Sequence, residues 1–227
     1  MLPLDHPGPV LGSAVDTWAT VAVAIGTIGT VVYALFRDVF MAPRRRPKLE
    51  LWFDGSGSDQ VVVETAEGDA ASVRLRVVNG PGKDTADDVV VLVTEARRVE
   101  DGATIANATP IVLPLTWSGS TPPLTVASVH PGSERHIDLL HLDLPTGDEL
   151  EVQRRWSETV PLHLDVTPKP AGAQDQLVPG TFEISVEVRA RNADAVGYVI
   201  PVDWDGRWSG KAALWDHLRV EPPRRVR

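Results

Sequence analysis

An uncharged run of 20 residues, Thr17 to Phe36, limits what this chain folds into more than any other feature. At about 1.5 Å per residue in a helix, the run matches the ~30 Å hydrocarbon core of a bilayer. Trp18 and Tyr33 stand near its ends, where amphipathic rings favour the membrane interface. A helix buried in a soluble core normally carries a polar stripe, whereas this run offers only threonines, whose hydroxyls bond within their own helix. The sequence therefore predicts a transmembrane helix over residues 17–36.

A cleavable signal peptide is the main alternative for this run. Signal peptides begin with basic residues and end at a small-residue cleavage site. Residues 1–16 contain neither Lys nor Arg, and the apolar run is long and is soon followed by Arg44, Arg45 and Arg46. We therefore expect an uncleaved anchor.

The charges on the two sides of the anchor predict its orientation. The N-terminal side holds Asp5 and Asp16 and no basic residue, whereas the neck, residues 37–48, holds five basic residues and a single acidic one. Because Lys and Arg gather on the cytoplasmic side, we expect residues 1–16 outside and residues 49–227 in the cytoplasm. Arg outnumbers Lys 18 to four, which is typical of a GC-rich bacterial genome and indicates the bacterial inner membrane. The residues predicted at the membrane interface are Trp18, Arg37, Arg44, Arg45, Arg46 and Lys48.

Small residues recur along one face of the predicted helix, and small residues allow two helices to approach closely in lipid. The resulting hypothesis is that the anchor self-associates and makes the chain a homo-oligomer. The residues of this face, spaced every four positions, are Ala22, Gly26, Thr30 and Ala34.

Charge and cysteine content exclude several functions for the remainder. Five of the 22 Lys and Arg residues and three of the 31 Asp and Glu residues precede Leu49, so the rest of the chain has a net charge of −11. An acidic domain binds nucleic acid poorly, so we expect no nucleic-acid partner. The chain has no Cys, which excludes disulfides, thiolate zinc sites and cysteine nucleophiles.

From Leu49 onward, apolar and polar residues alternate as in half-buried antiparallel strands. Phe182 to Arg189 alternates over eight residues, and Val89 to Val93 is a continuous apolar run typical of a central strand. About nine short strands separated by turn residues predict an all-β domain over residues 49–221, an antiparallel β-sandwich with a barrel as the alternative. The expected strands are 49–53, 60–65, 73–77, 89–93, 111–117, 135–142, 162–166, 182–189 and 198–204.

The last part of the chain gives a weaker pattern. Residues 211–220 fit a short helix or a final strand equally well. Pro222 and Pro223 end this segment. We expect residues 222–227 to be a basic tail that is frayed.

Two segments share a pattern in which a strand ends in Asn before a turn. Val77 to Gly82 leads through Asn79 into a Gly-rich turn, and Ala86 then precedes the Val-rich strand. Val188 to Asp194 again ends a strand in an Asn. The pattern resembles a hairpin of bacterial immunoglobulin-like, adhesion-type domains. The resemblance implies an immunoglobulin-like sandwich that serves as a binding module, although the relatives are mostly extracellular and this domain is predicted to be cytoplasmic.

The sequence lacks a recognisable catalytic or metal-binding arrangement. Its densest ionisable cluster is His130, His136, Asp138, His141 and Asp143. On a regular strand His136 and Asp138 project from one face, whereas His141 and Asp143 project from the other, so no metal site is predicted. The motifs of nucleotide sites and of serine hydrolases are also absent in their required context. We therefore expect no enzymatic activity, no cofactor and no metal.

The remaining candidates for recognition are aromatic and arginine residues. Tryptophan in such a domain belongs either to the core or to a binding surface, where it occurs together with Arg. Trp204 and Trp208 flank a tight turn and form either a lid on the core or an exposed patch. The possible partner surface consists of these two residues and a predicted loop with Arg154, Arg155 and Trp156.

Together these features predict a single-pass membrane-anchored, non-catalytic binding, scaffold or sensor module with an acidic β-sandwich in the cytoplasm. Its expected partners are the lipid bilayer and a protein bound through loops or an open sheet edge. The alternative is a membrane effector or accessory subunit of a bacterial stress or phage-defence system. In that case self-association of the anchor would perturb the membrane.

Overall fold

The computed structural model describes residues 12–65, 68–100, 103–106, 112–143, 160–169, 175–207 and 214–226. The chain divides into two units, Met1–Arg45 and Arg46–Arg227. The division lies close to residue 49, where the sequence predicted the β-domain to begin.

The apolar run near the N-terminus is helical. α1 spans Gly12–Phe36, a π-helical turn, η1, spans Arg37–Met41, and α2 spans Ala42–Arg45. The helical conformation therefore begins before the predicted span at residue 17. It also continues through most of the basic neck, which the sequence did not assign to any element.

Length and composition allow this helix to cross a membrane. The apolar stretch that meets both requirements is Trp18–Met41, and its side chains are exposed, as at Ile25 (66%). The hydroxyls of Thr27 and Thr30 donate hydrogen bonds of 2.9 and 2.8 Å to the carbonyls four residues earlier. Their polarity is thus satisfied within the helix, as a bilayer requires.

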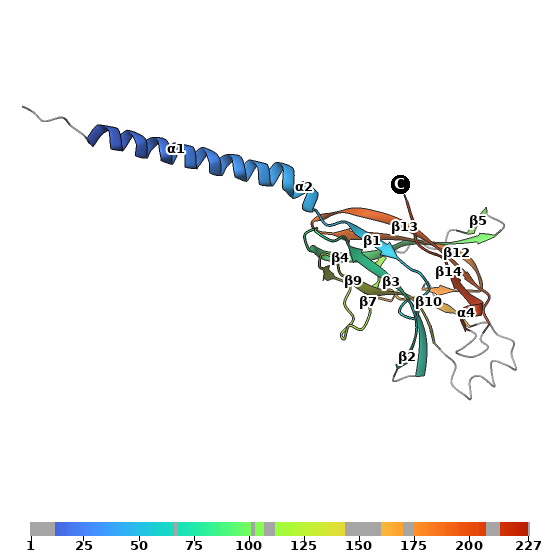
Figure 1. Cartoon of the computed structure of the whole chain (residues 1–227). Coiled ribbons are helices and arrows are strands. Elements are labelled where there is room, and N and C mark those ends of the chain that lie inside the picture. Colours follow the sequence, from blue (N-terminus) through green and yellow to red (C-terminus); the bar gives the residue numbers. More distant parts are fainter. Residues whose placement is uncertain are drawn as a thin grey trace, which may run out of the picture. The chain divides into compact units, whose positions relative to one another are not determined.

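Two antiparallel sheets form the second unit (Figure 1). The strands of the first sheet are β1 (Leu49–Trp52), β2 (Gln60–Thr65), β3 (Gly68–Asn79), β7 (Thr116–Trp117), β9 (Glu134–Asp143), β10 (Leu162–Leu164) and β11 (Gln176–Leu177). The strands of the second are β4 (Ala86–Glu100), β5 (Ala103–Ala106), β6 (Leu113–Pro114), β8 (Ala127–Val129), β12 (Gly180–Ala190), β13 (Ala193–Trp204), β14 (Leu218–Val220) and β15 (Arg224–Arg225). The predicted β-domain of two antiparallel sheets is therefore confirmed.

The strand order places β1 at one edge of the first sheet. That sheet runs β1–β3–β9–β10–β11, with β2 also on β3 and β7 on β9. The second sheet runs β14–β13–β12–β4–β5, with β6 and β8 on β4 and β15 on β13. Within the described residues, β1 pairs with β3 on one side and with no strand on the other.

The inward side chains of both sheets form one apolar core. β12 alternates between buried and partly exposed residues from Phe182 to Val188, as its sequence pattern predicts. Trp117 and Trp204 are among the largest fully buried side chains. The Trp204 indole N–H donates a 2.8 Å hydrogen bond to the Val160 carbonyl, so its polar atom is satisfied inside the core.

Most predicted strands form, with changes at their ends. β2 has the predicted bounds, and β13 begins at Ala193 instead of residue 198. The segment 211–220, left open between helix and strand, contains both: α4 spans Leu214–His217 and β14 follows directly. The expectation of a frayed tail is wrong at Arg224 and Arg225, because these two residues pair with Val199 and Tyr198 as β15.

The Asn that ends β3 ties together the turn beyond it. Asn79 is fully buried, and its amide group donates hydrogen bonds to the carbonyls of Asp84 (2.8 Å) and Val129 (3.1 Å). Its side-chain oxygen accepts a hydrogen bond from the backbone N–H of Lys48. Asn192 has a similar role at the surface. Its side-chain amide donates to the Thr85 carbonyl, and its side-chain oxygen accepts from the Asp87 backbone N–H. The Asn pattern in the sequence thus reports two side chains that hold neighbouring turns.

A buried carboxylate organises the loop between β1 and β2. Asp59 is fully buried and accepts a 2.9 Å hydrogen bond from the backbone N–H of Asp54. Arg76 of β3 lies 3.1 Å from Asp59 and 2.5 Å from Asp54. The guanidinium therefore offsets part of the negative charge of the loop and ties both carboxylates to β3.

Candidate functional site

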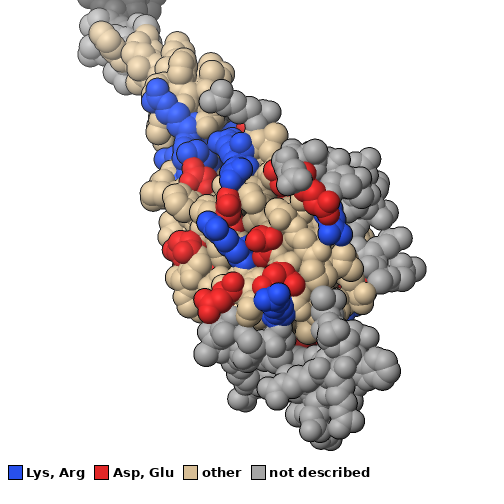
Figure 2. Space-filling model, turned by 90° about the vertical axis from the view of Figure 1, so that its right-hand side faces the viewer, with Lys and Arg blue, Asp and Glu red and all other residues tan. Residues whose placement is uncertain are grey.

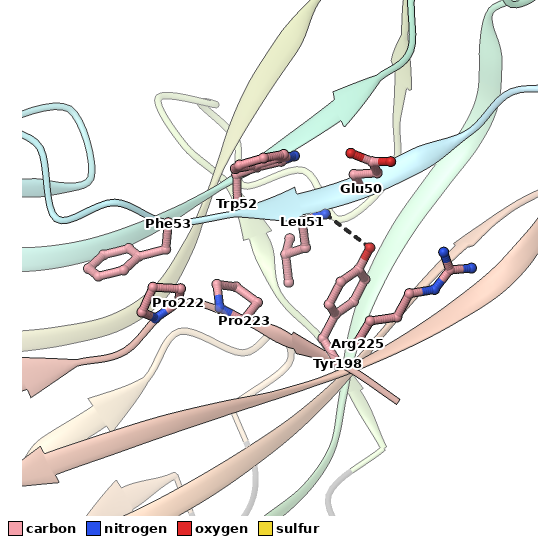
Figure 3. Close-up of a pocket in the computed structure, with 8 residues that line it drawn as sticks. All are labelled: Glu50, Leu51, Trp52, Phe53, Tyr198, Pro222, Pro223 and Arg225. Carbon is pink, nitrogen blue, oxygen red and sulfur yellow. Dashed lines mark hydrogen bonds between the residues drawn. The ribbon is translucent and has the colours of Figure 1, made fainter. Parts of the chain in front are cut away.

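The candidate site is a hollow of about 270 Å³ where the edge of β1 lies beside the C-terminal segment of the chain. Figure 3 shows the eight residues that line it. We call it the β1 hollow, and its lining residues are Glu50, Leu51, Trp52, Phe53, Tyr198, Pro222, Pro223 and Arg225. Five of them carry aromatic rings or proline rings, which is typical of pockets that bind apolar groups.

The alternation of β1 places its side chains on two sides of the strand. Leu51 and Phe53 are buried, whereas Glu50 and Trp52 project outward. The Trp52 indole is 53% exposed. An exposed indole next to an apolar hollow is unusual for tryptophan, which folding normally buries, and it marks a surface suited to binding.

The two ends of the β1 hollow differ in chemistry. Phe53 and Pro222 lie at one end, and Glu50 and Arg225 lie at the other (Figure 3). The Trp52 ring stands between these ends on the far side of β1 from the prolines, with its nitrogen toward Glu50. The hollow therefore offers an apolar end and a charged end to one ligand.

The Glu50 carboxylate at the charged end of the hollow already has an ion-pair partner. Lys48 lies 2.6 Å from Glu50. A hydrogen bond from Lys48, and a weaker one from the Trp52 side chain, lower the pKa of Glu50, so this group stays ionised and paired at neutral pH. Arg225 is exposed and attracts Glu50 electrostatically, but among the described residues no hydrogen bond or ion pair holds its guanidinium.

One hydrogen bond joins the two sheets beside the hollow. The backbone N–H of Leu51 donates to the Tyr198 hydroxyl at 3.3 Å (Figure 3). Tyr198 belongs to β13 of the second sheet and is buried. The phenol thus occupies the position at which a further strand would accept the Leu51 N–H.

A second hollow of about 410 Å³ lies on the outer face of β1 and β3. It shares Glu50 and Trp52 with the β1 hollow, and its other lining residues are Lys48; Arg76 and Val78 of β3; Gly80, Pro81 and Lys83 of the turn after β3; and Glu134 of β9. Arg76 is committed to Asp54 and Asp59. Trp52 therefore stands between two hollows, of which only the β1 hollow presents a guanidinium without a bonded partner in the described part of the chain.

Comparison of this chain with protein-family models, curated proteins and solved structures found no match.

Of the partner surface predicted from the sequence, the structure describes Trp204 alone. Trp204 is fully buried, which contradicts its assignment to a partner surface and agrees with the core alternative. Arg154, Arg155, Trp156 and Trp208 lie outside the described residues.

The predicted membrane-interface residues lie in or next to the helical unit and have exposed side chains. Trp18, for example, is 72% exposed. The small residues proposed for self-association lie within α1, and a Cβ added at Gly26 would meet no atom within 4 Å. These observations are compatible with the two hypotheses and do not test them.

A β-bulge corrects the predicted arrangement of the histidine cluster. In the register between β3 and β9, Val73 faces Leu140 and Arg74 faces Asp138, so Leu139 is an extra residue. Leu139 and Leu140 are both buried, and the alternation resumes shifted by one residue. His136, Asp138, His141 and Asp143 therefore share the outer face of the sheet, and the predicted split across two faces is wrong.

This outer face gathers further ionisable side chains from neighbouring strands. His141 faces His163 of β10 across the strand pair, and their rings stack with centroids 5.2 Å apart. Asp165 lies 3.9 Å from His141, and Asp175 lies 3.5 Å from His163. Within the described ranges, these groups do not form a cluster of three or more that could hold a metal ion.

Burial changes the titration of this face. Desolvation, assisted by the nearby charge of Asp138, raises the pKa of Asp165 to about 6. Desolvation also lowers the pKa of His141. Asp138 itself accepts hydrogen bonds from Arg74 and Ser118 and is firmly held. The outer face is therefore a hydrogen-bonded polar surface. Burial disfavours ionisation of one of its carboxylates, that of Asp165, and the described side chains do not assemble a metal site.

Sequence reasoning missed Trp52, Tyr198 and Arg225 as candidate site residues. Trp52 had a usable signal, because the pattern Leu-Glu-Leu-Trp places Glu50 and Trp52 on the polar face of a half-buried strand. No sequence pattern pointed to Arg225, because only the pairing of β15 with β13 brings this residue to β1.

Both signs of charge occur on the face shown in Figure 2. Several Lys and Arg side chains are grouped toward the top of the view, and acidic and basic side chains are intermixed below them.

Proposed function

We propose that this chain is a membrane-anchored, non-catalytic binding module of the bacterial inner membrane, with its β-domain in the cytoplasm and its binding site at the β1 hollow. The observation that carries the proposal is Trp52, an indole that is 53% exposed beside an apolar hollow. The resemblance to immunoglobulin-like adhesion-type domains, carried by Asn79 and Asn192, supports a binding role for this sandwich.

The anchor and its orientation rest on the N-terminal unit. The Trp18–Met41 stretch is long and apolar enough to span a bilayer. The basic residues that follow it support a cytoplasmic position for the β-domain, because Lys and Arg remain on that side.

The anchor is tested by extraction and by reporters. The full chain should stay in the pellet when bacterial membranes are washed with carbonate at high pH, and a chain without residues 1–45 should not. Green fluorescent protein fused at the C-terminus should fluoresce, and alkaline phosphatase at the same position should be inactive. An active phosphatase would contradict the orientation.

The binding site is tested by crosslinking in cells. A photoreactive p-benzoylphenylalanine replaces Trp52 in the full-length chain, and in a control it replaces Val178, which is 55% exposed and does not line the hollow. After irradiation, mass spectrometry should find an added mass at position 52 and none at position 178. The same yield at both positions would count against the β1 hollow as a site.

A further inference from the structure

The β1 hollow has the dimensions of a small-ligand site. Its volume of about 270 Å³ is close to the lower end of the range for small-molecule pockets. Its walls are Trp52, Phe53, Pro222 and Pro223, which offer ring faces and no hydrogen-bonding groups except the indole N–H. A compact apolar group, such as one aromatic ring, fills such a space.

The charged end of the hollow determines which sign of charge it favours in a ligand. Lys48 and Arg225 contribute two positive charges and Glu50 contributes one negative charge. Because Lys48 holds Glu50 at 2.6 Å, the charge left without a bonded partner in the described residues is that of the Arg225 guanidinium. A guanidinium presents parallel N–H donors that match a carboxylate.

Strand addition along β1 is excluded by the sheet geometry. An extended peptide that pairs with an edge strand needs the outward N–H groups of that strand. The outward N–H of Leu51 is already bonded to the Tyr198 hydroxyl. The second sheet therefore closes the middle of the β1 edge, and a peptide main chain has no continuous ladder to join.

We propose that the β1 hollow binds a small molecule in which a compact apolar group carries a carboxylate, with the apolar group against Phe53, Pro222 and Pro223, the carboxylate on Arg225, and Trp52 at the rim of the hollow. The inference rests on the proposed binding function and adds to it the chemical class of the ligand. The two ends of the hollow in Figure 3 correspond to the two ends of this molecule.

The experiment uses the full-length chain labelled with 5-fluorotryptophan in phosphatidylcholine nanodiscs. The seven tryptophans give separate fluorine signals, and the Trp52 signal is the one that disappears in Trp52→Phe. Three probes share one phenylethyl group and carry a negative, a neutral or a positive polar end: 3-phenylpropionate, 3-phenylpropanamide and 3-phenylpropylamine. We expect saturable movement of the Trp52 signal with the propionate, binding about tenfold weaker with the amide, and weaker still with the amine.

Two arginine variants test the assignment of the carboxylate. Arg225→Gln should remove the tenfold preference for the acid over the amide and leave amide binding unchanged. Arg224→Gln is the matched control, because Arg224 is the neighbouring residue, pairs with Glu221 and does not line the hollow. It should keep the full preference.

Several results would overturn the inference. They are equal binding of acid and amide, a preference that survives Arg225→Gln, or a Trp52 signal that the propionate does not move. Tighter binding of acetyl-Ala-Ala-Phe with a free C-terminus than of the propionate would make a peptide the ligand instead. Each of these can occur while crosslinking at position 52 still succeeds, so failure of the ligand class is separable from failure of the binding function.

Discussion

The hydroxyl of Tyr198 accepts a hydrogen bond from the backbone N–H of Leu51, and this contact joins β13 of one sheet to the edge strand β1 of the other. Both residues are buried, so water does not readily replace either partner. Both residues also line the β1 hollow.

Removing this hydroxyl should destabilise the fold and loosen the edge. Tyr198→Phe keeps the ring but leaves the Leu51 N–H without a partner, at a cost of about 1–2 kcal/mol in the free energy of unfolding. Urea denaturation of the full chain, followed by tryptophan fluorescence, measures the loss. Hydrogen exchange should also accelerate at the Leu51 amide, and by more than the acceleration that lower global stability causes at Leu75 in the centre of β3. Unchanged protection of Leu51 would show that the bond contributes nothing.

The buried carboxylate of Asp59 should matter more than the exposed one beside it. Asp59→Asn removes a fully buried charge from Arg76 and should cost about 3 kcal/mol in the free energy of unfolding. Asp54→Asn is the control, because Asp54 contacts the same guanidinium at 2.5 Å with a side chain that is 56% exposed. Its loss should be clearly smaller, since solvent screens an exposed pair. Equal losses in urea denaturation would contradict this account of the loop.

The two turn-holding asparagines offer a matched comparison of burial. Asn79→Ala leaves the carbonyls of Asp84 and Val129 without their donor inside the protein and should cost about 2–4 kcal/mol. Asn192→Ala breaks a similar pair of bonds at an exposed position and should cost about 1 kcal/mol or less. Thermal and urea denaturation check the order. A larger effect at Asn192 would mean that the β3 turn is held by other contacts.

The partly buried carboxylate of Asp165, on the outer face of the first sheet, should make the free energy of unfolding depend on pH. Because the folded pKa of Asp165 is about 6 and its ordinary value is 3.8, the folded state binds the extra proton between these values. The folded state is therefore penalised as pH rises through this window. Asp165→Asn should be more stable than the parent by up to about 3 kcal/mol at pH 7, and the difference should vanish near pH 4.

Urea denaturation at several pH values measures this difference. Asp143→Asn, on the same face of β9 but exposed, should show no such pH-dependent gain. A gain at Asp165 that is the same at pH 4 and pH 7 would mean that packing rather than charge is responsible.

Local pattern was sufficient wherever a strand is regular and one of its faces is buried. The alternation from Phe182 to Val188 and the bounds of β2 follow from residue order alone. The alternation pattern failed at β9, because a single extra residue, Leu139, moves the later side chains of that strand to the opposite face. Such a bulge cannot be recognised from the residue types alone. The segment 211–220 was ambiguous for a physical reason, since it contains one helical turn followed directly by a strand.

The candidate site was less accessible to sequence reasoning than the fold. Trp204 and Trp52 each lie in or next to a strand, yet one is fully buried and the other is 53% exposed. Strand alternation distinguishes the buried from the exposed tryptophan only once it is known which face of each strand points into the core. Arg225 is about 175 residues from Glu50 along the chain, and only the antiparallel pairing of β15 with β13 brings the two to one hollow.

The β1 hollow is lined by residues 50–53 in and next to β1, by Tyr198 of β13, and by Pro222, Pro223 and Arg225. Arg225 reaches the space beside β1 through the pairing of β15 with β13. A chain cut before Pro222 would keep Leu75, Trp117, Trp204 and the rest of its core, and would lose the site. Removal of residues 222–227 should therefore abolish the hollow that we propose as the binding site while the core stays folded.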